Sequence, residues 1–472
     1  MMEEPRQWRQ RQTPTGETHM QTHVPDGKLA AWRGITADIL KLGWPSILEQ
    51  VLVMMIGVFM TMLVGGISAV ALAASGMVNS LFFFLQAAFA ALSTGATVII
   101  SRLTGEGDGV GVRKAALQSL ILVVYCSVVL TVLCLVFYEP LLNLFIPRAT
   151  QPEYYEQGAI LFRILLFSLP PLTINIVISG IYRGVGNMLL PLVVSLIVNV
   201  AYLIVGLFLI NVLDMGIAGA AWAAVAARFL GGLIMVVALY RGRGRISLNR
   251  HDGFRLELGM VKRILNIGLP AAMEQIVMQG GFLVLNIVIY TMADVDKVTY
   301  PIVMNINSIS FMPGFGLGMA TATLVGHSLG AGDPRRAERI NFCSTALAIA
   351  MMIVISAALA LFAQPIAGAY TDEADVLALS VQCIRVLALG APFMAAVTIL
   401  SATLRTGGDI KFVMYSTILG IWIIRIAMSW GLHHFWQMGI IGVIWMLLAD
   451  FLIRTGLYAW RVRQGRWKSI RV

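Results

Sequence analysis

Residues 43–50 read GWPSILEQ, and residues 268–275 read GLPAAMEQ, a second copy displaced by 225 positions. Each copy lies near the start of a long apolar run, and each places a glutamate, Glu49 or Glu274, at the same point of the motif. Ionised side chains inside a hydrocarbon span are costly, so they are rare there and usually functional. Two carboxylates in matching places predict a repeated membrane protein with a functional group in each copy.

The composition excludes a protein folded in water alone. Of 472 residues, 58% are hydrophobic and 12% are charged, and the mean hydropathy is +0.82. These polar groups are too few to cover a water-exposed surface of this size. A helix needs about 20 apolar residues to cross a bilayer core, and twelve such runs can be placed between residues 42 and 460. The predicted fold class is an all-α polytopic membrane protein with twelve transmembrane helices.

More motifs recur in the same order along the chain. The recurring pairs are GEGD at 105–108 with GAGD at 330–333 (shift 225), RGVGN at 183–187 with RTGGD at 405–409 (shift 222), and Gly216 with Gly439 (shift 223). An even number of helices separates the copies, so both halves cross the membrane in the same direction. The sequence predicts two six-helix lobes in a parallel repeat, related by an axis along the membrane normal.

The basic residues orient this arrangement. Most of the 34 Lys and Arg residues fall in the two tails and in the loops on one side of the spans, and such loops face the cytoplasm. The predicted segments are a polar cytoplasmic tail at 1–37, an N-lobe with helices 1 to 6 at 38–240, a basic cytoplasmic linker at 241–263, a C-lobe with helices 7 to 12 at 264–460, and a basic cytoplasmic tail at 461–472. The net charge of +10 therefore reflects topology and not nucleic-acid binding.

The sequence lacks the residue patterns that several classes of chemistry require. The four cysteines lie in apolar runs without ligand or CxxC spacing, which predicts neither a metal site nor a disulfide framework. The GxGD loops follow no strand and precede no Lys-Ser/Thr, so ATP is not expected as a partner. The loops hold no His/Asp/Cys constellation, so we expect no enzyme activity and no cofactor.

The motifs together resemble one known family. LVGHSLGAGD at 324–333, YRGVGN at 182–187, LRTGGD at 404–409 and GRWK at 465–468, in this order, resemble the multidrug and toxic compound extrusion (MATE) transporters. The likeness runs from about residue 40 to residue 468. It implies two six-helix lobes around a central cleft and export of organic, often cationic, compounds in exchange for inward H+ or Na+.

The acids familiar from this family are replaced here. Where some members of the family carry acids in helices 1, 7 and 10, this chain has Met60, Met278 and Met394. Glu49 lies eleven residues before Met60, about three helical turns, so the two share nearly one face. Glu274 lies four residues before Met278 and also shares its face. Both glutamates are therefore predicted to line the family's cleft nearer the cytoplasm, with Met60 and Met278 as apolar wall residues.

Glu49 and Glu274 are the candidate ion-coupling or substrate-binding residues. If a proton on the carboxylate and a cationic substrate favour different states, the two exclude each other and exchange results. In the alternative interpretation, each glutamate only bonds a neighbouring helix or stabilises the cytoplasmic end of its span. Polar side chains near the same faces are candidates for ligand contact or for joining helices: Gln50, Gln275, Gln279 and Asn286.

One further acid lies in the last apolar run. Asp450 precedes Arg454 by four residues, a spacing that predicts a local ion pair on one helix face.

These observations favour a secondary active exporter of organic, cationic or amphiphilic compounds. It would export its substrate in exchange for H+, in preference to Na+. It would alternate between inward-open and outward-open states by rocking its two lobes. The expected partners are a small organic substrate and the lipid bilayer, and we expect a monomer in the plasma (inner) membrane of a bacterium. Two alternatives stay open: a flippase for a lipid-linked or amphiphilic metabolite, and a membrane receptor or channel without coupled transport.

Overall fold

The computed structural model describes residues 28–146, 148, 152–242 and 257–470, and the described chain is helical with short turns. The N-lobe helices are α1 (Lys28–Gly65), α2 (Ala69–Glu106), α3 (Gly109–Val136), α4 (Tyr138–Phe145), α5 (Pro152–Leu166), α6 (Leu169–Gly184), α7 (Leu189–Asn211) and α8 (Gly216–Tyr240). The C-lobe helices are α9 (Leu258–Tyr290), α10 (Asp294–Gly330), α11 (Pro334–Leu361), α12 (Ala363–Gly368), α13 (Ala374–Thr406), α14 (Ile410–Ile418), the π-helix η1 (Leu419–Ala427), α15 (Met428–Trp436), α16 (Gly439–Arg463) and the 3₁₀ turn η2 (Arg466–Lys468).

The predicted all-α membrane fold is confirmed. Within the described ranges, 11 helices are long and apolar enough to cross a membrane, or 12 if the bent pair α5 and α6 forms one span. α1 begins at Lys28, inside the segment predicted as a tail. Most of the predicted basic linker at 241–263 lies outside the described residues.

The pair α5 and α6 bends by 52° at its junction. Pro170 and Pro171 stand in the first turn of α6, and proline has no N–H to continue the hydrogen-bond ladder of the preceding helix. The side chain of Ser168 is fully buried at this break. The bend is confined to the N-lobe, because α13, which contains the matching Pro392, is one continuous helix.

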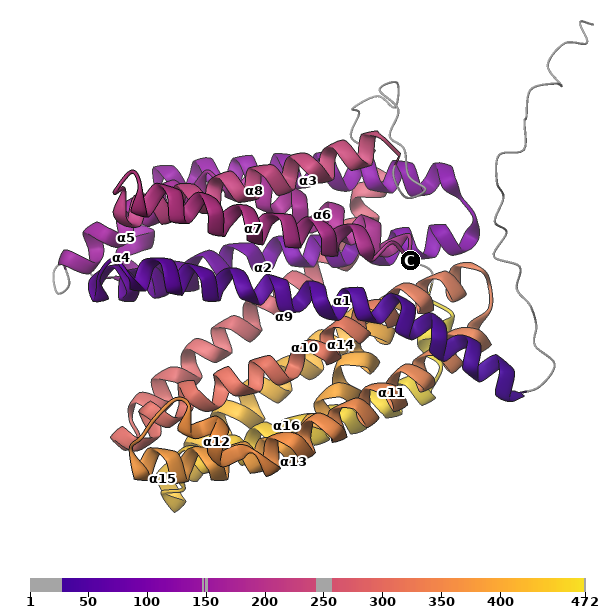
Figure 1. The fold of residues 1–472 in the computed structure, drawn as a ribbon. Helices are drawn as coiled ribbons and strands as arrows, with labels where there is room; N and C mark the ends of the chain where they lie inside the picture. The colour runs from indigo at the N-terminus through magenta and orange to yellow at the C-terminus, as the bar shows by residue number, and fades with distance from the viewer. Residues whose placement is uncertain (1–27, 147, 149–151, 243–256, 471–472) are drawn as a thin grey trace, which may run out of the picture.

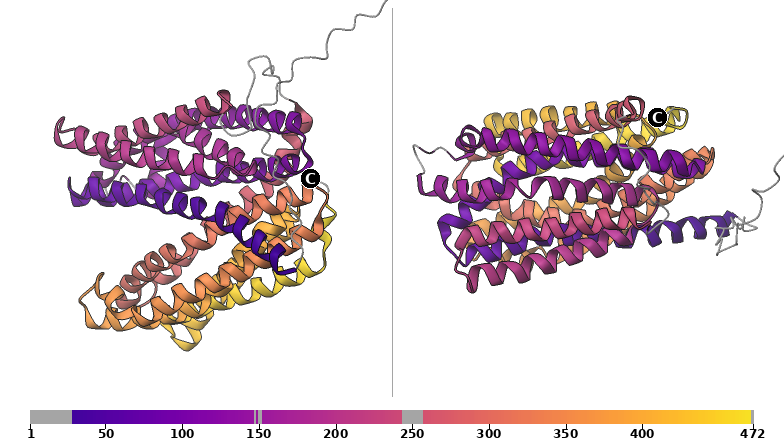
Figure 2. Two further views of the ribbon diagram at one scale, coloured as in Figure 1. Left: turned by 45° about the vertical axis from the view of Figure 1, so that its right-hand side comes forward. Right: turned by 90° about the horizontal axis from the view of Figure 1, so that it is seen from above.

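The two lobes converge at one end of the molecule and diverge toward the other (Figures 1 and 2). The C-terminus lies at the converging end, which we call the closed end, and α4, α12 and α15 lie at the diverging end, which we call the open end. Large apolar side chains remain exposed along the outer helices, for example Val200 and Leu233. Such a surface suits contact with lipid chains and not with water.

At the closed end each lobe sends its first helix across to the other. Ile35 and Ile39 of α1 pack into a C-lobe core cluster, whereas Ile264 and Ile267 of α9 pack into the N-lobe core. Pro45 and Pro270 lie inside these helices, and an interior proline removes a backbone hydrogen bond and permits a bend. The repeated motif therefore marks the region where each helix passes from one lobe to the other.

Candidate ion-coupling site

Glu49 of α1 forms a buried ion pair within the N-lobe. Its Oε1 lies 2.7 Å from Nη1 of Arg183 at the C-terminal end of α6, and the two side chains are 5% and 11% exposed. The second carboxylate oxygen, Oε2, is buried without a hydrogen-bond partner among the described residues. A buried acceptor without a partner is costly. A proton added to this carboxylate would therefore bind at Oε2, the oxygen that no hydrogen bond from the described residues occupies.

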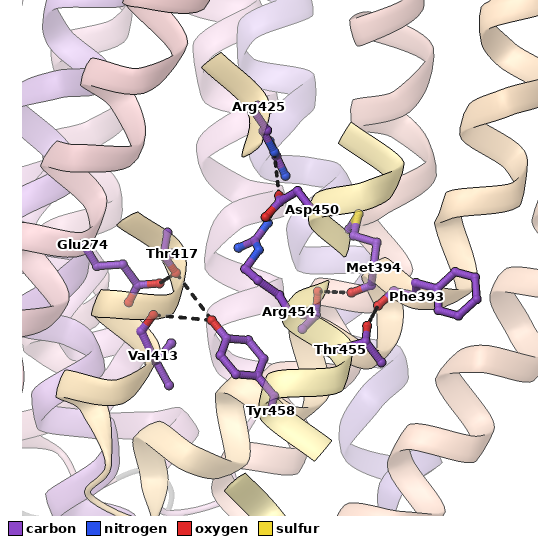
Figure 3. A network of polar contacts seen from close by, with 11 residues as sticks. Glu274, Phe393, Met394, Val413, Thr417, Arg425, Asp450, Arg454, Thr455 and Tyr458 are labelled. Carbon is purple, nitrogen blue, oxygen red and sulfur yellow. Dashed lines mark hydrogen bonds and ion pairs between the residues drawn. The ribbon is translucent and has the colours of Figure 1, made fainter. Parts of the chain in front are cut away.

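Glu274 of α9 forms the matching ion pair within the C-lobe. Its Oε1 lies 2.7 Å from Nη2 of Arg405 at the end of α13. The hydroxyl of Thr417 donates to the same oxygen at 3.0 Å, and the Tyr458 hydroxyl lies 3.5 Å from that of Thr417 (Figure 3). Within the described part of the chain, Glu274 thus accepts hydrogen bonds from two side chains, whereas Glu49 accepts one.

Both pairs join residues at repeated positions. Arg183 and Arg405 open the two copies of the RGVGN-type motif, so each copy supplies its own glutamate and its own arginine. The structure does not pair the two glutamates with each other. Each negative charge is compensated inside its own lobe, and the arginines are the partners that the sequence analysis did not assign.

Replacing Thr417 with valine tests the C-lobe pair. Valine keeps the shape of this buried side chain but removes the hydroxyl that donates to Glu274. We expect the free energy of unfolding to fall by about 1.5 kcal/mol, the usual loss for a hydrogen bond to a charged group. Unfolding by SDS in mixed micelles measures this change. The control is Thr61→Val, since the exposed Thr61 hydroxyl donates only to a carbonyl one turn earlier; an equal loss in both variants would contradict the assignment.

Asp450 of α16 is fully buried between two arginines (Figure 3). Arg454, four residues later, pairs with Asp450 Oδ2 as predicted. Arg425 Nε also lies 2.6 Å from the same oxygen, a partner that the sequence analysis missed. Together with Glu274 and Arg405, the C-lobe network holds three guanidinium groups against two carboxylates.

Arg425 lies in the π-helix η1 (Leu419–Ala427). The repeat shift grows from 222 at Asp409 to 223 at Gly439, so the C-lobe copy contains one additional residue between these points. A π-turn accommodates one extra residue without breaking a helix, and such turns often occur at functional sites. The matching N-lobe helix α7 is a regular α-helix. The change of shift is the sequence signal that could have located this segment.

The polar candidates have different surroundings. Gln50 Nε2 lies 3.6 Å from the Met319 sulfur of α10, a contact between the lobes. Asn286 donates to the Phe282 carbonyl one turn earlier in its own helix. Gln275 and Gln279 are half-buried.

The two methionine candidates lie in separate cores. Met60 is buried in the N-lobe core, and Met278 is half-buried against a C-lobe core cluster. Among the described residues, no group of three or more His, Cys, Asp and Glu side chains could hold a metal ion.

Comparison with known proteins assigns the family. The family model MatE matches residues 45–208 and 270–430, one stretch in each lobe. The chain belongs to the MATE family. It is therefore a multidrug-efflux type transporter and not an enzyme, it is an integral membrane protein, and the family needs no cofactor.

Relatives of this MATE protein match most of its length. It is 27% identical to the "Probable multidrug resistance protein NorM" of Thermotoga maritima over 92% of this chain and 94% of that protein. It is 25% identical to the "Multidrug resistance protein NorM" of Burkholderia vietnamiensis over 90% and 93%.

Solved structures share the fold. A MATE family transporter of the MOP superfamily in an outward-facing conformation matches with a TM-score of 0.86 at 22% identity, over 93% of this chain and 98% of that one. A MOP superfamily transporter from Pyrococcus furiosus matches with a TM-score of 0.86 at 21% identity, over 94% and 99%. These matches confirm the predicted arrangement in two lobes.

Proposed function

We propose that this MATE transporter exports organic cationic or amphiphilic compounds by antiport with H+, and that Glu49 is its principal coupling residue. The observation that carries the proposal is the buried Oε2 of Glu49, which has no hydrogen-bond partner among the described residues. The closed end would face the cytoplasm, because basic loops and both termini belong on that side. The structure then corresponds to a state open toward the outside.

Proton binding at Glu49 must rearrange its ion pair. A proton on Oε2 removes the negative charge and leaves the Arg183 guanidinium, 11% exposed, without a counterion. An uncompensated buried charge is strongly unfavourable, so the protonated pair tends to separate. An organic cation would need the same carboxylate in its ionised form, and it would have to replace Arg183 as the counterion of Glu49. The two ligands therefore favour different states, which is the thermodynamic basis of exchange.

The arginine partners favour H+ over Na+. A sodium ion bound to either glutamate would lie near a guanidinium whose nitrogen is 2.7 Å from the carboxylate oxygen. Two positive charges at such a distance repel strongly in a medium of low dielectric constant. A proton forms a covalent bond to the oxygen and removes the charge, so it needs no space beside the arginine.

The C-lobe is less suited to a cation than the N-lobe. Its network holds three arginines and two acids, and Glu274 accepts hydrogen bonds from both Arg405 and Thr417, whereas Glu49 accepts one from Arg183. We therefore assign Glu274 a secondary part in coupling. The side chains of Gln50, Gln275, Gln279 and Asn286 are proposed as supporting polar groups in the substrate path, and Met60 and Met278 as its apolar neighbours.

A flux assay tests the proposal. The protein is reconstituted in vesicles, a pH gradient is imposed, and movement of a fluorescent organic cation is recorded with Na+ present or replaced by choline. We expect gradient-driven transport at the same rate in both media. Transport that requires Na+ would contradict H+ coupling. Movement of a labelled lipid head group without movement of the cation would instead support the flippase alternative.

A further inference from the structure

The closed end contains two contacts that the repeat relates to each other. Arg102 of α2 donates from Nε to the Thr406 carbonyl at 3.1 Å. His327 of α10 places Nε2 2.8 Å from the Gly184 carbonyl, and a carbonyl can only accept. Arg102 and His327 differ by 225 positions and Gly184 and Thr406 by 222, the shifts of the surrounding motifs. Each lobe therefore reaches into the other with an equivalent residue and binds an equivalent carbonyl.

Two glycines let the helices approach closely enough for these contacts. A Cβ built on Gly105 of α2 would overlap the His327 carbonyl oxygen, and one built on Gly330 of α10 would overlap the Arg102 carbonyl oxygen. Gly105 and Gly330 also match each other at a shift of 225. Small residues at a helix crossing allow backbone to meet backbone, and here both lobes use the same position.

The bound carbonyls adjoin the arginines of the candidate site. Gly184 follows Arg183, and Thr406 follows Arg405. The hydroxyl of Thr323 in α10 also donates to the Arg183 carbonyl, at 2.9 Å. The opposite lobe thus binds the same helix ends whose side chains compensate the two glutamates.

Arg102 makes a second contact, with the C-terminal segment. Its Nη1 donates to the Ile470 carbonyl at 2.8 Å. That segment is anchored by Trp467, which is fully buried and donates to the Val462 carbonyl at 3.0 Å. Arg102 therefore binds two separate elements of the C-lobe, the end of α13 and the C-terminal segment.

We propose that Arg102 and His327 are a repeat-related pair of gate residues that hold the closed end shut and release it when the lobes rock. The inference rests on the proposed function in one respect, namely that the lobes separate at this end during transport. It assigns a positioning role to both residues, because the carbonyls that they bind belong to the residues next to Arg405 and Arg183, the partners of the two glutamates.

Distance measurement between spin labels tests the gate without requiring transport. Val110 and Arg335 begin α3 and α11 at repeat-equivalent positions and are exposed, so cysteines there carry the labels in a background lacking Cys126, Cys134, Cys343 and Cys383.

We expect Arg102→Ala to shift the closed-to-open ratio about tenfold toward longer distances, and His327→Ala about fivefold, from the usual strengths of charged and neutral hydrogen bonds. His327→Gln retains an N–H donor and should restore much of the closed population. The control Arg241→Ala removes an arginine from the end of α8 and should leave the distances unchanged.

A glycine variant tests the same gate independently of hydrogen bonds. Gly105→Ala should open the closed end, because the added methyl group and the His327 carbonyl cannot occupy the same space. Alanine is a better helix former than glycine, so loss of folding is not the expected cause. Gly76→Ala, on the same helix with open space around its Cβ position, is the matched control and should keep the closed distance.

The gate and the coupling proposal fail in different ways. Unchanged distances in Arg102→Ala, His327→Ala and Gly105→Ala would overturn the gate. If these variants open the closed end while Glu49→Gln retains normal pH-driven transport, the gate stands and the assignment of Glu49 is wrong. If Arg102→Ala opens the closed end and His327→Ala does not, the assignment of both residues as a repeat-related pair is wrong, because His327 would not contribute to closure.

Discussion

Glu49→Gln is expected to abolish pH-driven transport of an organic cation, with a loss of at least about tenfold in rate. Glutamine has the shape of glutamate and can still accept from Arg183, but it can neither ionise nor bind the transported proton. Glutamine also leaves Arg183, 11% exposed, without a counterion, so the single variant can lose stability as well. Flux of a fluorescent cation under an imposed pH gradient measures the effect.

A paired substitution separates coupling from folding. The double variant with Glu49→Gln and Arg183→Gln removes both buried charges, and we expect it to recover thermal stability in detergent while pH-driven transport remains lost. Glu156→Gln, at an exposed position on α5, should transport like the unmodified protein. Full pH-dependent transport by the double variant would exclude Glu49 as the coupling residue.

Asp450→Asn is expected to lower the free energy of unfolding by about 3–5 kcal/mol, the usual effect of breaking a buried ion pair. Asp450 is fully buried and is the shared partner of Arg425 and Arg454, each 9% exposed. Without the carboxylate charge, two guanidinium groups remain close together in a medium of low dielectric constant. Unfolding in SDS mixed micelles measures the loss.

A neutral triple variant provides the matched comparison. Replacing Asp450 by leucine and both Arg425 and Arg454 by methionine removes all three charges, and apolar replacement of a whole buried ionic group is often neutral or stabilising. We therefore expect most of the stability to return. Asp375→Asn, at an exposed position on α13, should have little effect. If the triple variant is as unstable as Asp450→Asn, unpaired charge is not the cause of the loss.

Features set by local sequence were predictable. The membrane-spanning helices follow from the length of their apolar runs, and the two lobes follow from motifs that recur at shifts of 222 to 225. The pair of Asp450 with Arg454 follows from a spacing of four on one helix. Each of these needs only neighbouring residues or a comparison of the chain with itself.

The arginine partners of Glu49 and Glu274 required knowledge of helix packing. The pairs join residues 134 and 131 positions apart, and an intramembrane carboxylate could have paired with several of the helices around it. The motif showed that both arginines recur, but not which helix each would meet. The same limit applies to Arg425, whose direction depends on the π-turn that absorbs one additional residue.

The sequence by itself determined the membrane class, the repeat and the two acids at its start, because hydrophobic length and motif spacing are properties of the chain alone. Only the tertiary structure decided how those acids are compensated, where α5 and α6 bend, and how the lobes meet. Arg102 and His327 illustrate the difference. Their equivalence is visible in the sequence, but binding the carbonyls beside Arg405 and Arg183 requires two helices to cross at Gly105 and Gly330, which only the packing of the two lobes brings about.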